Sequence, residues 1–430
     1  MNVTLILRLF ILIFSSFIFN NGFSQSDEKN YKSNIKTAQL YKYGNPQGLP
    51  VYSLNSGDRL QLGFDDLDGN VKSYYYTYVL CDYNWQPVNV NPFDYIKGFT
   101  QNRISTYRYS SRAFTRYTHY EAVLPGRDSY PIKSGNYLLK VFLDGDTTKL
   151  AFTKRMLVVD PKTIITGAVV QPFTPQLFPT HQKIKFSAQI NGINSFSAAQ
   201  QVKAVILQNN RWDVAQRDIA PTFVRGSTLE YNSENIAIFP GGKEWRWLDL
   251  RSLRLQSDRV DRGIYNEKST ELFLKTDAER NGQRYVYYPD LNGMYVITTY
   301  ETINPQWQGD YATTHFYYST PDGRAYPKKD IYLAGYFTSY EISDQWKMNY
   351  NDSSGKYELP VFLKQGYYNY TYITTDKDDP AIRNELEGNY FETENQYTIL
   401  IYYRSFTDQS EQLIGVGELN SRNDRPGFSF

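Results

Sequence analysis

The sequence has few of the residues that form covalent cross-links and metal centres. It contains one cysteine, Cys81, and three histidines, His119, His181 and His315, none of them in a zinc-ligand spacing. An intramolecular disulfide is therefore excluded, so stability must come from ordinary cores. We expect no metal site at these histidines, and we interpret His119 as a half-buried strand residue rather than a general base.

Excess charge of one sign and long apolar runs are also missing. The 46 basic and 45 acidic residues give a net charge of +1, which indicates neither a nucleic-acid partner nor an anionic membrane surface. Mean hydropathy is -0.57, and charged residues interrupt every apolar segment after the N-terminus. We therefore predict no direct membrane span in the mature chain.

The first residues have the pattern of an export signal. Arg8 precedes an apolar run over residues 9–19, and the small residues Gly22 and Ser24 follow. This predicts a secretory signal peptide over residues 1–24, cleaved near Ser24. No cysteine lies near that position, which argues against a lipid-anchored protein.

The usual catalytic signatures are absent as well. The chain has no G-x-S-x-G elbow and no phosphate-binding G-x-x-x-x-G-K-[ST] loop, and no residue near Cys81 marks an activated thiolate. Paired carboxylates for glycoside hydrolysis stay open, because such partners can be distant in sequence. We predict a protein that is not an enzyme, with no catalytic, cofactor-binding or metal-binding residues and no small-molecule substrate.

Aromatic residues, by contrast, are abundant. They make up 17% of the chain, with 40 Tyr and 25 Phe, a bias that favours half-buried strands. Short aromatic or β-branched runs at residues 59–64, 72–80, 137–143 and 150–159 are bounded by Gly, Asp, Asn and Pro. These runs predict β-strands, and the predicted fold class is all-β.

The turn residues between the predicted strands suggest three domains. We predict an N-terminal β-sandwich over residues 25–160, a middle β domain over 161–320 and a C-terminal sandwich over 321–430. The expected architecture is tandem immunoglobulin-like β-sandwiches, the last of early-set type. Within the first domain, Asp144-Gly145-Asp146 predicts a hairpin turn.

One acidic segment could hold calcium. Residues 65–70 read Asp-Asp-Leu-Asp-Gly-Asn, but counting Asp66 as first ligand puts Val71 where an EF-hand needs glycine. We therefore interpret the segment as a hairpin turn between two strands.

A membrane β-barrel is a competing architecture, since the strands are rich in Tyr and the chain ends in Phe430. Residues 421–427, however, are charged and contain proline, which disfavours a lipid-facing closing strand. We reject the barrel.

Tryptophans raise a carbohydrate-binding hypothesis. The pair Trp245 and Trp247, or Trp85 and Trp346, could stack on sugars, although most tryptophans are core residues. Residues 332–372, which contain Trp346, look like glycogen-binding early-set modules. This sandwich hosts many functions, so the likeness is a weak argument for glycan binding.

A set of short motifs, taken in order and spacing, resembles the plug protein family of the type IX secretion system. The motifs are Phe64-Asp65-Asp66-Leu67, Tyr74-Tyr75-Tyr76-Thr77, Cys81-Asp82 with Trp85, Tyr117-Thr118-His119-Tyr120, Ser134-Gly135-Asn136-Tyr137, Val158-Val159-Asp160, Glu394-Asn395 and Tyr402-Tyr403-Arg404. The resemblance covers most of the mature chain.

The resemblance implies a periplasmic protein that docks on the large outer-membrane β-barrel translocon and closes its periplasmic opening. It does not indicate which residues contact the partner. A periplasmic carbohydrate-binding protein is the alternative, and a hydrolase is a distant third.

Overall fold

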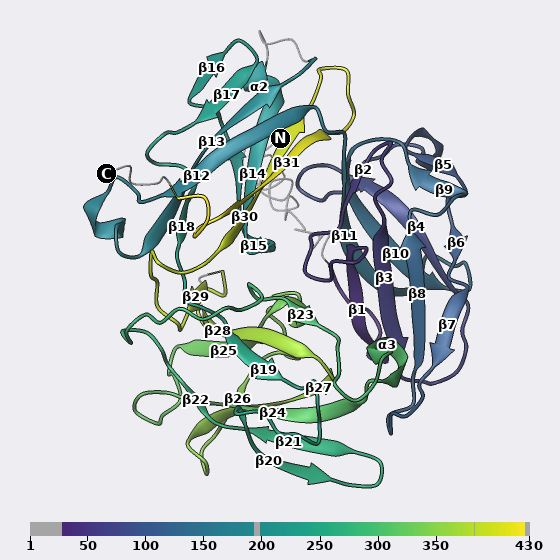
Figure 1. Cartoon of the computed structure of the whole chain (residues 1–430), viewed down its shortest axis with the longest axis vertical. Coiled ribbons are helices and arrows are strands. Elements are labelled where there is room, and N and C mark those ends of the chain that lie inside the picture. The colour runs from purple at the N-terminus through teal and green to yellow at the C-terminus, as the bar shows by residue number, and fades with distance from the viewer. Residues whose placement is uncertain (1–27, 193–197, 382, 426–430) are drawn as a thin grey trace, which may run out of the picture.

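The computed structural model describes residues 28–192, 198–381 and 383–425. The predicted signal peptide, residues 1–24, lies outside them. Figure 1 shows three groups of strands in contact with one another: a purple and blue group, a teal and yellow group, and a green group. Each group contains two main sheets, so the prediction of an all-β chain of tandem β-sandwiches is confirmed.

Helices in the described ranges are single turns. No helix there is long and apolar enough to cross a membrane. Their bounds are η1 (Pro92–Asp94), η2 (Pro175–Leu177), η3 (Tyr336–Thr338), α2 (Ala198–Gln201) and α3 (Pro305–Gln308).

The first domain, residues 28–160, contains a four-stranded and a five-stranded sheet. In sheet order, the first has β1 (Ile35–Lys42), β3 (Leu60–Asp66), β8 (Thr118–Leu124) and β7 (Thr106–Tyr109). The second has β2 (Val51–Ser53), β11 (Leu150–Val159), β10 (Gly135–Leu143), β4 (Tyr74–Cys81) and β6 (Asn102–Arg103). A separate pair is formed by β5 (Ile96–Gly98) and β9 (Ser129–Pro131).

Tyrosine and phenylalanine fill the core between these sheets. Along β4, Tyr74, Tyr76 and Tyr78 are buried and the residues between them are half-buried, as the two-residue period of a strand requires. Phe64 of β3 stacks on Tyr120 of β8, with ring centroids 5.1 Å apart. Such pairs add about 0.5–1.5 kcal/mol beyond area burial, so packing accounts for much of the aromatic bias.

The two predicted hairpin turns have different outcomes. Asp144 and Gly145 have positive φ values of 58° and 72° and join the antiparallel strands β10 and β11, which confirms that turn. The hairpin predicted at residues 65–70 is wrong: residues 67 and 68 do form a turn, but β3 and β4 lie in different sheets. This segment instead crosses from one sheet of the sandwich to the other.

The second domain is also a pair of sheets. One contains β12 (Thr163–Val170), β13 (His181–Ile190), β17 (Thr228–Tyr231) and β16 (Phe223–Arg225), with β18 (Ile238–Pro240) beside β13. The other contains, in order, β15 (Arg211–Ile219), β14 (Val202–Gln208), β30 (Gln396–Tyr403) and β31 (Gln412–Asn420). The last two strands come from the C-terminal end of the described chain.

The third domain occupies the sequence between these parts. One sheet has β19 (Arg246–Asp249), β28 (Tyr367–Asp376) and β23 (Tyr295–Val296), and β28 also pairs with β25 (Lys329–Ala334) and β29 (Arg383–Glu385). The other has β20 (Val260–Tyr265), β21 (Thr270–Leu274), β24 (Tyr311–Ser319), β27 (Lys356–Lys364) and β26 (Asn349–Asn351), with β22 (Asp277–Ala278) beside β24.

The third domain is therefore an insertion in the second. The predicted boundary between residues 320 and 321 falls inside one core, in which Tyr318 packs with Ile331 and Leu333. Strand β30 pairs with β14 along its whole length, from Val202 opposite Tyr403 to Gln208 opposite Tyr397. The predicted domains 161–320 and 321–430 are corrected accordingly to about 161–242 with 391–425, and about 243–390.

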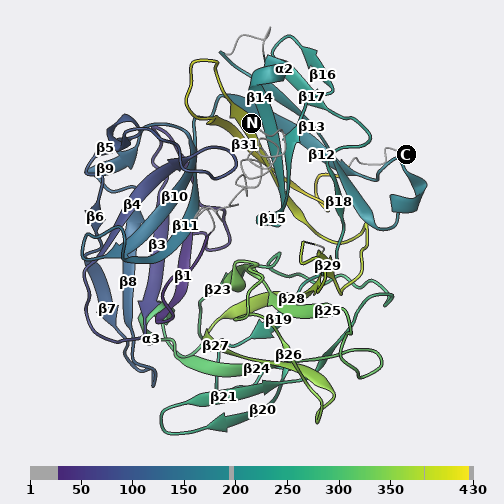
Figure 2. The ribbon, with the colours of Figure 1, turned by 180° about the vertical axis from the view of Figure 1, so that it is seen from behind.

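The boundary predicted after residue 160 lies close to a change of sheet. Strand β11 ends at Val159 in the first domain, and β12 begins at Thr163 in the second. The first and third domains also touch, because α3 lies beside β8 in both Figure 1 and Figure 2.

Candidate functional site

The three histidines lie in three different sheets. His119 is on β8, His181 begins β13, and His315 is on β24, where its ring stacks on Phe273 with centroids 4.3 Å apart. His119 is in a strand, as predicted, but it is buried rather than half-buried. The fold does not bring the histidines together into one centre.

Cys81 is buried at the end of β4. Burial raises the pKa of its thiol to about 12. The thiolate form that reacts with electrophiles or binds metals is therefore scarce at neutral pH.

The acidic segment at residues 65–70 is held by protein donors. The carboxylate of Asp66 accepts hydrogen bonds from Asn34, at 2.6 Å, and from the Tyr74 hydroxyl, at 2.9 Å, and pairs with Lys72 at 2.8 Å. Burial alone raises the pKa of Asp66, but these donors outweigh it and hold the pKa below its ordinary value. These contacts of the Asp66 carboxylate therefore stabilise the crossover of the chain between the two sheets.

Asp65 points to the other side, where the first domain meets the third. Its Oδ2 accepts hydrogen bonds from Lys364 Nζ at 2.5 Å and from the Tyr311 hydroxyl at 2.6 Å. Its Oδ1 lies 2.7 Å from Nδ1 of His119. We call these four side chains, which come from β3, β24, β27 and β8, the junction cluster.

The charges of the junction cluster compensate one another. Burial by itself raises the pKa of Asp65, but the charge of Lys364 and the contact with His119 outweigh it, so the pKa lies below its ordinary value. Burial lowers the pKa of Lys364, and Asp65 opposes that change. The Lys364 ammonium also lies 4.2 Å from the centre of the Tyr117 ring. The pair is thus satisfied only while the two domains stay together.

Hydrogen bonds between side chains and backbone groups extend this junction around α3. Asp310 accepts hydrogen bonds from the amides of Phe114 and Thr115, at 2.8 and 3.0 Å. The Tyr117 hydroxyl donates to the carbonyl of Gly309 at 2.7 Å. These contacts fix the third domain against the first in addition to the junction cluster.

The first and second domains share a mixed core. Leu138 of the first domain packs in one cluster with Val205 and Leu400 of the second. Trp85 meets Trp212 edge to face, with centroids 4.8 Å apart. Trp85, a candidate for sugar stacking, is therefore part of an interdomain core.

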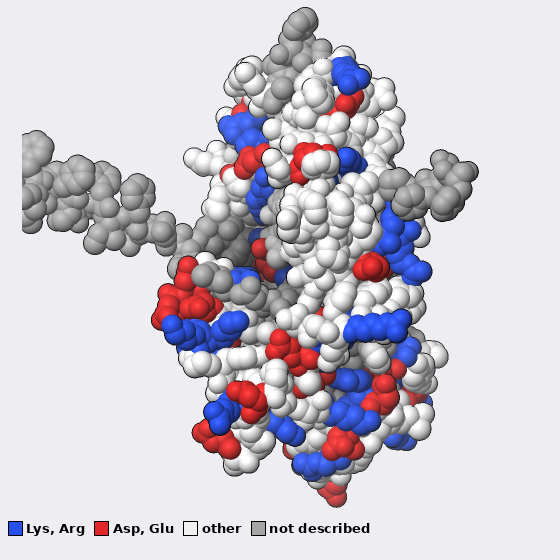
Figure 3. Space-filling model, turned by 90° about the vertical axis from the view of Figure 1, so that its left-hand side faces the viewer, with Lys and Arg blue, Asp and Glu red and all other residues white. Residues whose placement is uncertain are grey.

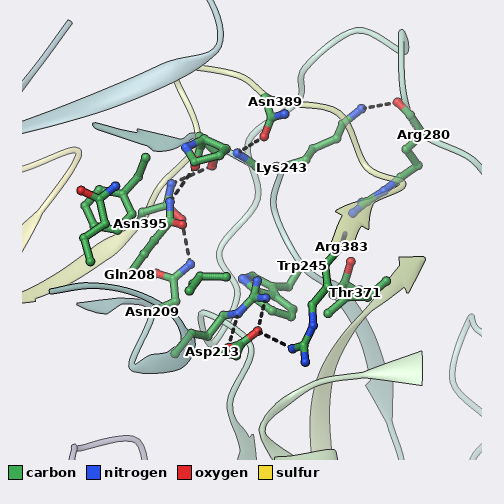
Figure 4. Close-up of a pocket in the computed structure, with 18 residues that line it drawn as sticks. Gln208, Asn209, Asp213, Lys243, Trp245, Arg280, Thr371, Arg383, Asn389 and Asn395 are labelled. Atoms are coloured by element: carbon green, nitrogen blue, oxygen red, sulfur yellow. Dashed lines mark hydrogen bonds and ion pairs between the residues drawn. The ribbon is translucent and has the colours of Figure 1, made fainter. Parts of the chain in front are cut away.

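A hollow of ≈ 300 Å³ lies between the second and third domains (Figure 4). Asp213 accepts from Arg211 at 2.8 Å on one side and lies 4.0 Å from Arg383 on the other. Asn395 accepts from Asn209 at 2.7 Å and donates to the carbonyl of Gly241 at 2.8 Å. These lining groups are engaged with one another, so they hold the two chain crossings between the domains.

The other candidate tryptophans are also packed. Trp245 is buried and meets the Tyr340 ring edge to face at 6.1 Å. Trp247 meets Tyr288 at 5.0 Å, and half-buried Trp346 meets Phe337 at 6.0 Å. None of these contacts makes an open stacking platform for a sugar.

Near that hollow, three carboxylates converge. Glu244, Asp290 and Glu394 each place an oxygen within 4.8 Å of the others. Burial raises the pKa of Asp290 to about 7, and the charge of Glu244 adds to the effect. We call these three residues the acidic cluster. No local sequence pattern marks this cluster, because its members are far apart in the chain.

Part of the outer surface is uncharged, and it carries exposed apolar side chains. Figure 3 shows an uncharged area in the middle of the upper half, with charged groups around it, and interspersed charges of both signs below. Exposed large apolar side chains occur on all three domains, at Phe93, Phe99, Tyr109, Phe114, Phe173, Phe223, Tyr300 and Ile303 among others. Surfaces of this kind suit contact with another macromolecule.

The architecture defines the class of protein: an all-β chain of three sandwich domains, one inserted in another, joined by buried junctions. Residues 35–160 match the family model described as the type 9 secretion system plug protein 1st domain. The first domain is therefore similar to the first domain of plug proteins, and the resemblance predicted from the sequence is confirmed for these residues.

One solved structure extends the likeness to the whole fold. A crystal structure of a hypothetical protein from Parabacteroides merdae ATCC 43184 matches with a TM-score of 0.86 and 27% sequence identity. The match covers 91% of this chain and 98% of that chain. No curated protein matches the chain.

Proposed function

We propose that this protein is the gating subunit of a type IX secretion translocon. In this role it is exported to the periplasm, docks on a large outer-membrane β-barrel and closes its periplasmic opening while no substrate passes. The observation that carries the proposal is the match of residues 35–160 to the plug protein first domain.

The physical character of the molecule supports a steric role. A gate must keep its shape against a pore, and here each domain is joined to another by buried contacts: the junction cluster between the first and third domains, and the mixed core around Leu138 and Val205 between the first and second. Blocking a pore needs a shaped surface that excludes water and requires no chemistry. The exposed apolar side chains on each domain supply such surface.

Gene deletion tests the gate. We expect deletion to let periplasmic proteins leak and large antibiotics enter through the open translocon, and the intact gene to restore the barrier. An envelope that stays tight without the protein would contradict the proposal.

Single charged substitutions can then locate the contact. Ile303 is 93% exposed and Phe173 is 77% exposed, on different domains, so Ile303→Asp and Phe173→Asp should leave the fold intact. Glu418→Gln, at an exposed residue of β31, is a matched surface control. A variant on the docking face should reproduce the leak, whereas a variant elsewhere and the control should not.

A further inference from the structure

The acidic cluster sits where the chain crosses between the second and third domains. Glu244 lies on the outgoing crossing between β18 and β19, and Glu394 lies on the returning crossing just before β30. Asp290 belongs to a third-domain loop ahead of β23. Three segments that are distant in sequence therefore bring negative charge to one point.

Protein donors satisfy only part of this cluster. Asp290 accepts from the amides of Trp245, at 2.5 Å, and Asn292, at 2.7 Å. Glu394 accepts from the side-chain amides of Asn292, at 3.0 Å, and Asn420. Among the described residues, no lysine or arginine forms an ion pair with any of the three carboxylates.

Two buried oxygens, one in the acidic cluster and one on a residue that contacts it, have no hydrogen-bond donor among the described residues. Glu244 is completely buried, and its Oε1 accepts from Tyr285 at 2.5 Å, but its Oε2 accepts from nothing in the described chain. Oδ1 of Asn292, whose amide nitrogen contacts Glu394, is likewise buried and unpartnered. An ionised carboxylate oxygen and an amide oxygen accept hydrogen bonds but do not donate them, so a cation or a donor from outside the chain would satisfy both atoms.

We propose that Glu244, Asp290 and Glu394, with the side-chain oxygen of Asn292, bind one calcium ion that ties the two chain crossings together. Calcium takes six to eight oxygen ligands at about 2.3–2.6 Å in flexible geometry. Oxygens that share one such ion lie at most about 5 Å apart, a limit that the carboxylate oxygens of the acidic cluster meet. Asp290 and Glu394 are only half-buried, which leaves a path from solvent.

Calcium is favoured over magnesium by this ligand set. Magnesium requires near-ideal octahedral geometry at about 2.0–2.1 Å and retains several waters. Here the carboxylate of fully buried Glu244 converges with two carboxylates from separate loops, an arrangement that suits the larger, more adaptable cation.

Terbium luminescence on the mature full-length chain tests the site. Tb³⁺ replaces Ca²⁺ and emits when nearby aromatic groups are excited, and Trp245 and Tyr285 both hydrogen-bond to the cluster. After treatment with EDTA, we expect saturable emission that Ca²⁺ displaces at micromolar to millimolar concentration. Glu394→Gln should abolish it, whereas Glu418→Gln, on the exposed face of β31, should not.

Thermal melting separates a metal site from a merely structural role. We expect Ca²⁺ to raise the Tm of the wild type by at least about 3 °C and Mg²⁺ to raise it less. In EDTA, Glu394→Gln should melt at or above the wild type, because it removes repulsion between unpaired carboxylates, and Ca²⁺ should not shift it. The proposal is overturned if the wild type shows neither a Ca²⁺ shift nor saturable emission, or if Glu394→Gln retains both.

Discussion

Lys364 of the third domain places its ammonium nitrogen 2.5 Å from a carboxylate oxygen of Asp65 in the first domain, and both side chains are completely buried. The two residues are 299 positions apart in the chain. Because an isolated buried charge is very unfavourable, Lys364 depends on the first domain for its counter-charge, and Asp65 depends on the third domain for the lysine that pairs with it. The pair therefore makes the position of the third domain part of the stability of the first.

Removing one charge of this pair should destabilise the protein strongly. We expect Asp65→Asn to lower the free energy of unfolding by about 3–5 kcal/mol, because Lys364 stays buried without a counter-charge. Urea unfolding measures the change. Asp68→Asn, at a carboxylate that is 53% exposed, is the control and should cost under about 1 kcal/mol. Equal effects of the two changes would contradict this account of the junction.

The same pair predicts a pH dependence. The pKa of Asp65 lies below its ordinary value, so its contribution to stability is present above the unfolded pKa of about 3.9 and is lost as pH falls through the folded pKa. The stability gap between the wild type and Asp65→Asn should therefore be largest near neutral pH and shrink in acid, below about pH 4. Unfolding curves across this range measure it, and a constant gap would argue against an ionised Asp65.

A second buried ion network lies inside the third domain. Arg246 donates to Asp277 and Glu387, each at 2.7 Å, and all three side chains are buried. We expect Arg246→Met to lower the free energy of unfolding by about 3 kcal/mol or more, because both carboxylates lose a donor. Exposed Arg324→Met is the matched control, and its effect should stay within about 0.5 kcal/mol. A near-neutral Arg246→Met would contradict the role of this network.

Cys81 should be unreactive in the folded protein. Burial raises the pKa of its thiol to about 12, so at about pH 8 it is neutral and shielded from solvent. We expect a thiol reagent such as DTNB to react with one thiol per chain in denaturant and with almost none in native buffer. Rapid reaction of the native protein would show that the core around β4 opens.

Truncation tests the inserted third domain. A chain that ends at residue 390 lacks β30 and β31 and leaves β14 unpaired on one side. We expect protease to digest the second domain of this chain while a fragment of the first domain survives. If the middle domain instead remained resistant, the C-terminal strands would not be part of its fold.

Local patterns predicted the strands but not their partners. The alternation of Tyr74, Tyr76 and Tyr78 and the Asp-Gly turn at residue 144 are local features, and both are in the structure. The pairing of β30 with β14 spans the whole third domain. A strand's sequence records which face is buried but not which strand lies beside it, so the boundary at residue 320 was misplaced.

The junction cluster and the acidic cluster also depend on contacts between residues that are distant in sequence. Asp65 and His119 belong to the motifs that resemble the family, yet nothing near them in the sequence marks Lys364 as their partner. Glu244, Asp290 and Glu394 stand alone in sequence, and only the two crossings between domains bring them together. The first domain was recognisable because its motifs are dense over a continuous stretch of the chain, residues 35–160.

The central claim is that this protein docks on a secretion translocon. The most direct measurement is an affinity pull-down of a C-terminally tagged copy from detergent-solubilised envelope, with the partners identified and quantified by mass spectrometry. We expect one very large outer-membrane β-barrel protein at near-equal amounts. Recovery of the tagged protein alone would contradict the claim.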